Sequence, residues 1–116
     1  MTDQASFRLQ RIDKTPLVLV SGEVDLSNVA AFRSFVAQAA QDESSAVVVS
    51  LSLVSYFDSH MLAALAELSQ RLQTNRKRLL VCAERNSAAA HILRLNGMDR
   101  AIQVFDNEAS AIEAAR

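Results

Sequence analysis

Short apolar runs alternate along this chain with segments of helical periodicity, and this alternation constrains the fold more than any other feature. Residues 17–20, 46–49 and 79–83 are apolar at successive positions, which is typical of strands buried on both faces of a sheet. After the first two runs, apolar residues recur every three or four positions, as on the buried face of an amphipathic helix. Strands that alternate with helices predict a mostly parallel sheet with right-handed crossovers.

Two weaker strand signals lie nearer the ends of the sequence. Residues 7–12 alternate apolar and polar side chains, as in an edge strand with one solvated face, and Thr15 and Pro16 mark the turn that follows. Residues 102–104 form a last short strand. The sequence therefore predicts an α/β fold with a mixed, mostly parallel sheet of about five strands and about four α-helices packed against it, in a single domain over residues 1–116.

Polar residues mark where the predicted helices begin. Ser27 or Asn28 can cap the first helix, Asp58 the second and Ser87 the third, because their side-chain oxygens accept hydrogen bonds from free backbone N–H groups. The predicted helices span about residues 29–42, 59–78, 88–95 and 107–115.

Composition excludes several classes of partner. With 12 basic and 13 acidic side chains the net charge is −1, so no positive excess is available for nucleic acid or an anionic membrane surface. The longest uninterrupted apolar run, residues 61–66, is far shorter than the roughly 18 residues of a membrane span. Cys82 is the single cysteine, and the first six residues do not resemble a signal peptide. We therefore expect a cytoplasmic protein without membrane insertion.

Functional groups are expected at the carboxyl ends of the strands, where ligands meet open α/β sheets. Residues 22–27 and 56–61 stand out there because both loops are acidic and carry small residues. Asp58, Ser59 and His60 are the three residue types of a hydrolase triad. Neighbours at a helix start fan out around its axis, so we expect neither that Ser59 faces His60 nor that Asp58 orients its ring. No catalytic residue is predicted, and the chain is not expected to be an enzyme.

Cofactor and metal sites are likewise not expected. The two glycines, Gly22 and Gly97, are isolated, so no glycine-rich loop could hold a nucleotide phosphate. His60, His91 and Cys82 fall on different predicted elements and lack the spacing of metal ligands.

Ser59 is the residue best placed for a regulatory role. It is predicted in the first turn of a helix, where free N–H groups and a partial positive charge accommodate a phosphoryl group. Phosphorylation would add nearly two negative charges beside Asp58 and near Glu23 and Asp25, enough to repel a partner that had fitted a hydroxyl. The same residues also fit an unmodified first-turn serine.

Three segments, residues 19–25, 47–59 and 93–98, resemble the STAS domains of bacterial anti-sigma factor antagonists. The resemblance extends over about residues 15–115 and implies the STAS fold, in agreement with the predicted sheet. It implies a regulatory protein whose unphosphorylated form binds an anti-sigma factor that is also a serine kinase, which frees a sigma factor. Phosphorylation of the serine after the aspartate, here Ser59, ends the binding, and a serine phosphatase restores it. The kinase supplies ATP and magnesium, so no cofactor is expected here.

The resemblance also implies a partner-binding surface, whose expected members are Gly22, Glu23, Asp25, Ser27, Asp58, Ser59, His60 and Met61. The family usually has a second small hydroxyl residue and then glycine after the phosphorylated serine, where this chain has His60 and Met61. Met61 fits two roles equally: a contact with the partner, or packing in the core beside Leu65. The departures motivate an alternative function, a constitutive structural subunit of a signalling assembly or a membrane transporter in which Ser59 is never modified. A homodimer is left open.

Overall fold

The computed structural model describes residues 4–116, which form one five-stranded sheet with the strand order β1-β2-β3-β4-β5. The strands are β1 (Ser6–Ile12), β2 (Thr15–Val24), β3 (Ala46–Phe57), β4 (Arg78–Cys82) and β5 (Gln103–Phe105). β1 pairs with β2 in an antiparallel hairpin, and every other neighbouring pair is parallel. The helices within these residues are α1 (Val29–Ala39), α2 (Ser59–Thr74), α3 (Ala88–Leu95), α4 (Glu108–Ala115) and the short 3₁₀ turn Met98–Arg100. The predicted fold class is confirmed.

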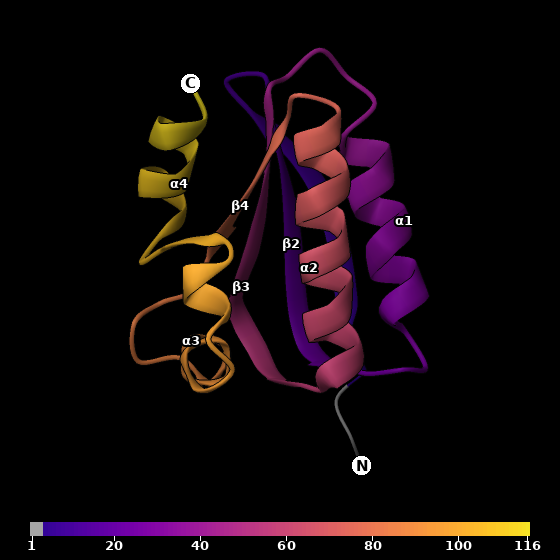
Figure 1. Cartoon of the computed structure of the whole chain (residues 1–116), viewed down its shortest axis with the longest axis vertical. Coiled ribbons are helices and arrows are strands. Elements are labelled where there is room, and N and C mark those ends of the chain that lie inside the picture. The colour runs from indigo at the N-terminus through magenta and orange to yellow at the C-terminus, as the bar shows by residue number, and fades with distance from the viewer. Residues whose placement is uncertain (1–3) are drawn as a thin grey trace.

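Both faces of the central strands are buried, because alternate side chains enter two separate hydrophobic clusters. The larger cluster joins the sheet to α1, α2 and α3, and its members include Val18, Val47, Phe32, Leu65 and Leu93. The smaller cluster packs α4 on the sheet, through Ala111, Ile112 and Ala115 against Leu17, Val48 and Leu80. Figure 1 shows α4 on the opposite side of the strands from α1 and α2. None of the helices described combines the length and the apolarity needed to cross a membrane.

The hairpin turn lies two residues earlier than predicted. Thr15 pairs with Ile12 and Pro16 with Arg11, so both predicted turn residues already belong to β2. The turn is made by Asp13 and Lys14, whose φ angles are 51° and 72°. Two consecutive residues at positive φ match the twist of a two-residue hairpin. Pro16 is tolerated because pairing with β3 begins only at the following residue.

β2 and β3 run further than the apolar runs predict, and the first two helices end earlier. β2 continues through Gly22, where φ is 84° and a Cβ atom would lie 2.5 Å from the backbone oxygen of Gln4. Glycine at this position lets the N-terminal segment pass close to the strand. The first helix ends at Ala39 rather than near residue 42, and the second at Thr74, because Arg78 already begins β4.

β3 carries two more residues than β2 over the region where they pair. Leu19 pairs with Ser50 and Ser21 with Leu53, a first shift, and Gly22 pairs with Val54 but Glu23 with Tyr56, a second. Each shift is a β-bulge, which re-aims the side chains that follow it. The bulges place two residues, rather than one, between the buried positions Leu51, Val54 and Phe57.

Candidate functional site

The two loops singled out in the sequence meet at one edge of the sheet, which we call the carboxyl edge: residues 22–28 at the end of β2 and residues 56–61 at the end of β3. Val24 pairs with Phe57, and the N–H of Asp58 donates to the carbonyl oxygen of Val24 at 3.2 Å. The predicted surface residues of the β2 loop therefore lie beside those of the β3 loop.

The loop after β2 is held by its own side chains. Asp25 Oδ1 accepts hydrogen bonds from the N–H of Ser27 at 2.9 Å and from its hydroxyl. Asn28 Oδ1 accepts from the N–H of Asp25 at 2.9 Å, while its amide nitrogen donates to the carbonyl oxygen of Glu23 at 3.0 Å. Asn28 precedes α1, but its side chain bonds the loop and does not cap the helix. Leu26 projects to solvent at the tip.

The start of α2 has the geometry predicted for a capped helix. Asp58 has an extended backbone conformation, and its Oδ1 accepts from the N–H groups of His60 at 2.9 Å and Met61 at 3.4 Å. Burial of Asp58 alone would raise its pKa, but the hydrogen bonds from the His60 ring and from these two N–H groups bring the pKa below its ordinary value. The carboxylate is therefore fully charged at neutral pH.

The expectation that Asp58 cannot orient the His60 ring is wrong. Asp58 Oδ2 lies 3.2 Å from Nδ1 of His60, because the capping conformation folds the carboxylate back over the first helical turn. The second part of the expectation agrees with the structure, since no hydrogen bond joins the Ser59 hydroxyl to His60 among the residues described. An Asp–His pair is therefore present, but it does not activate Ser59 as a nucleophile.

Ser59 is the first residue of α2 and is exposed. It lies between Asp58 and His60, which are joined by hydrogen bonds. His60 is also exposed, whereas Met61 is fully buried in the larger cluster together with Leu65. Of the two roles predicted for Met61, the structure shows packing in the core. The side chain of Met61 is therefore not part of the expected partner-binding surface, and its backbone N–H already donates a hydrogen bond to Asp58.

Metal ligands are not gathered anywhere in residues 4–116, because no three His, Cys, Asp or Glu side chains lie close enough together to hold an ion.

Residues 7–105 match the family model described as Mlab, STAS domain. The chain belongs to this STAS-domain family. No curated protein sequence matches it.

Solved structures place the domain among known STAS folds. An anti-sigma factor antagonist from Mycobacterium paratuberculosis has a TM-score of 0.86 at 24% identity, over 98% of this chain and 96% of that chain. The anti-sigma factor antagonist SpoIIAA has a TM-score of 0.75 at 17% identity in its unphosphorylated form, over 94% of this chain and 95% of that chain. SpoIIAA of Bacillus in its phosphorylated form has a TM-score of 0.70 at 18% identity, over 96% of this chain and 100% of that chain.

The same fold also occurs as part of a larger protein. The murine anion transporter Slc26a9 has a TM-score of 0.71 at 18% identity, and the match covers 97% of this chain but 22% of the transporter. These likenesses show the fold of this STAS domain, and the predicted STAS resemblance is confirmed.

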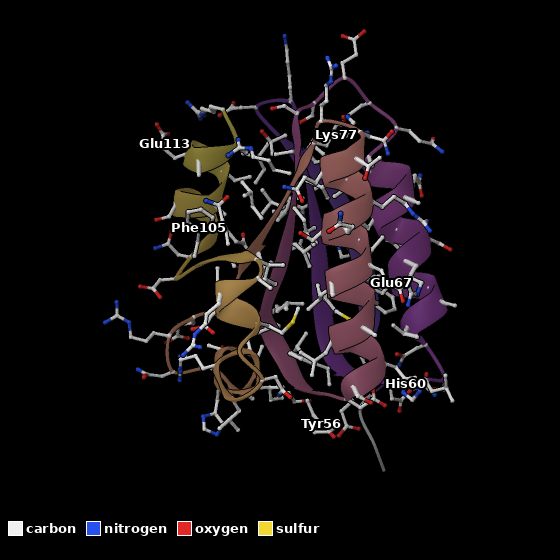
Figure 2. All side chains as sticks on the ribbon, viewed as in Figure 1. Tyr56, His60, Glu67, Lys77, Phe105 and Glu113 are labelled. Atoms are coloured by element: carbon white, nitrogen blue, oxygen red, sulfur yellow. The ribbon has the colours of Figure 1, made fainter. Side chains whose placement is uncertain are left out.

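Two exposed residues of the STAS domain, Leu53 and Tyr56, were not among the predicted surface residues, although Tyr56 lies in the segment 56–61 that the sequence singled out. Simple alternation along β3 would place Leu51 and Leu53 on the same face, but the bulge between them separates one from the other. Figure 2 shows Tyr56 at the same end of the molecule as His60. The available signal was the serines at positions 50, 52 and 55, which interrupt the apolar run, but serine alone does not locate a bulge.

Proposed function

We propose that this STAS domain is an anti-sigma factor antagonist, a cytoplasmic regulatory protein rather than an enzyme. Its unphosphorylated form binds an anti-sigma factor with serine-kinase activity through the carboxyl edge, and this binding frees a sigma factor. Phosphorylation of Ser59 ends the binding, and a serine phosphatase restores it. Gly22, Glu23, Asp25 and Ser27 contribute to the same surface, with Asp58 and His60 beside the modified residue.

The observation that carries the proposal is the exposed Ser59 hydroxyl at the first position of a capped helix. A kinase can reach this hydroxyl without unfolding the domain. The free N–H groups and partial positive charge of a helix start also stabilise a phosphate there.

The charge of the neighbouring residue explains how one phosphate could release a partner. Asp58 is ionised at neutral pH, because its hydrogen bonds lower its pKa. A phosphate on Ser59 would therefore stand beside an existing carboxylate. In the proposed complex the same hydroxyl faces the phosphates of the kinase's nucleotide, and like charges placed opposite each other cost several kcal/mol, about a hundredfold or more in affinity.

The test is an affinity capture from an extract of the host cell, with the wild-type chain and Ser59→Glu as baits and mass spectrometry of the bound proteins. A matched control is Ser110→Glu, which adds the same charge to an exposed serine in the first turn of α4, on the other face of the sheet. We expect a serine kinase on the wild-type and Ser110→Glu baits and its loss from Ser59→Glu. Recovery of the same non-kinase protein, such as a transporter ATPase, by all three baits would contradict the proposal and favour a structural subunit.

A further inference from the structure

We infer that Leu53 and Tyr56 form an apolar platform, flanked by the carboxylates of Glu23 and Glu84, that binds an apolar side chain of the partner set between lysine or arginine residues. The inference rests on the proposed function and names the part of the domain that supplies most of the affinity. Phosphorylation of Ser59, by contrast, controls whether the complex forms.

The two bulges of β3 create the platform. Val54 points into the larger cluster and pairs with Gly22, so the residues on either side of Gly22 point to the opposite face of the sheet. These residues are Ser21 and Glu23, and their partners in β3 are Leu53 and Tyr56. Both large side chains therefore project from the face that α4 covers elsewhere.

Neither residue belongs to a hydrophobic cluster of the described part of the chain. The side chains that α4 contacts, such as Leu17, Val48 and Leu80, lie in the other half of that face. Leu53 remains 73% exposed and Tyr56 51% exposed. A single exposed leucine is ordinary on a protein surface, but a leucine next to a tyrosine on a rigid sheet has the composition of an interface centre.

The charges around the platform select the chemistry of its partner. Glu23 pairs with Tyr56 across the strands, and the N–H of Glu84 donates to Oγ of Ser52, next to Leu53, at 3.2 Å. Within residues 4–116 neither carboxylate forms an ion pair, and the adjacent Arg85 bonds Asp106 at 2.9 Å. Unpaired carboxylates around an apolar centre complement a partner that offers cations around an apolar side chain.

A second copy of this chain fits the platform poorly. A twofold contact brings identical patches together, so the acidic rim of one copy would face the acidic rim of the other. The platform also lies at the same end of the sheet as the proposed switch, since Tyr56 is near the end of β3 and Ser59 begins α2 three residues later. One partner can therefore place cations against Glu23 and Glu84 while its nucleotide phosphates face Ser59.

Calorimetric titration with the purified kinase recovered by the wild-type bait tests the platform. We expect Leu53→Ser and Tyr56→Ser each to weaken binding about tenfold or more, as for residues at an interface centre. The matched control is Leu95→Ser at the end of α3, where the leucine is 71% exposed, and it should leave the affinity unchanged. Thermal unfolding of each variant checks that the fold is retained. Glu23→Gln and Glu84→Gln should weaken binding less and flatten its dependence on salt.

Ser59→Asp, titrated in parallel, separates the platform from the proposed function. Wild-type affinity for Leu53→Ser and Tyr56→Ser, with binding lost in Ser59→Asp, would overturn the platform and leave the function standing. Weak binding by the platform variants, with full binding by Ser59→Asp, would support the platform and overturn the switch. A dimer of the free wild-type chain in analytical ultracentrifugation that Leu53→Ser dissolves would overturn the choice of partner, and failure to recover any kinase would overturn both proposals.

Discussion

The two ends of the sheet use their charged residues differently. At the amino end of the parallel strands, ion pairs join separate elements: Arg11 bonds Asp42, and Arg116 bonds Asp13 at 2.6 Å. Lys77 adds hydrogen bonds from its Nζ to the carbonyl oxygens of residues 42 and 44. At the carboxyl ends of the strands, Arg85 pairs with Asp106, but Glu23, Asp25 and Glu84 have no such cation within residues 4–116, and Leu26, Leu53 and Tyr56 are exposed. Figure 2 shows Lys77 and Tyr56 at opposite ends.

The difference teaches which end is available to a partner. At the amino end, Arg11, Asp42, Asp13 and Arg116 already form ion pairs within the chain. At the carboxyl edge, Asp25 and Asp58 accept hydrogen bonds from nearby N–H groups, which fixes the shape of the loops but leaves the negative charge unpaired by Arg or Lys. Exposed ion pairs contribute little to stability. The two ends of the sheet therefore differ mainly in the charged groups that remain free to bind a partner, and less in how much they stabilise the fold.

The largest loss of stability is expected behind the carboxyl edge, at Met61. Met61→Ala removes a fully buried side chain and should lower the free energy of unfolding by about 2–5 kcal/mol, through lost burial and the remaining cavity. Urea unfolding followed by circular dichroism measures it, with the exposed His60→Ala as control. Equal, small losses in both variants would contradict the assignment of Met61 to the core.

The next largest effect separates two glycines. Gly22→Ala should cost about 1–3 kcal/mol from positive φ alone, and more because the new Cβ meets Gln4 O at 2.5 Å. Gly97 has a φ of 70° but nothing within 4 Å of an added Cβ, so Gly97→Ala should show the backbone cost alone. The same urea titration compares them, and equal losses would mean that the close approach of residue 4 does not shape the carboxyl edge.

A smaller effect is expected from the cap of α2. Asp58→Ala should lower the free energy of unfolding by about 1 kcal/mol, whereas Asp58→Asn keeps a capping oxygen and should lose less. Because the folded-state pKa of Asp58 is lowered, the stability owed to its charge is complete above the ordinary aspartate pKa of about 4. It is lost as pH falls through the lowered pKa. A wild-type advantage over Asp58→Asn that stayed constant down to about pH 2 would contradict this linkage.

The smallest effect is expected at the amino end. Arg116→Gln removes the exposed pair with Asp13 and should change the free energy of unfolding by less than about 1 kcal/mol. It should leave the affinity for the kinase unchanged in the calorimetric titration. Weakened binding in Arg116→Gln would show that the amino end of the sheet also contributes to binding the kinase.

Local signals predicted the fold, since buried runs, helical periodicity and the Asp58 cap depend on neighbours in sequence. Features set by contacts between distant residues escaped prediction. β2 continues through Gly22, where the backbone of residue 4 lies too close for a side chain. Tyr56 is exposed because β3 has bulges in its pairing with β2. The Asp58–His60 contact depends on a capping conformation that spacing alone does not reveal. Ser59 was predicted in the first turn, and its exposure is what the structure adds.

The most direct test of the central claim is to incubate the purified chain with the recovered kinase, ATP and magnesium, to locate the phosphate by mass spectrometry and to titrate the modified chain against the kinase. We expect one phosphate on Ser59, none in Ser59→Ala, and a loss of affinity of about a hundredfold or more on phosphorylation. A phosphate found only at other residues, or unchanged affinity of the chain phosphorylated at Ser59, would contradict it.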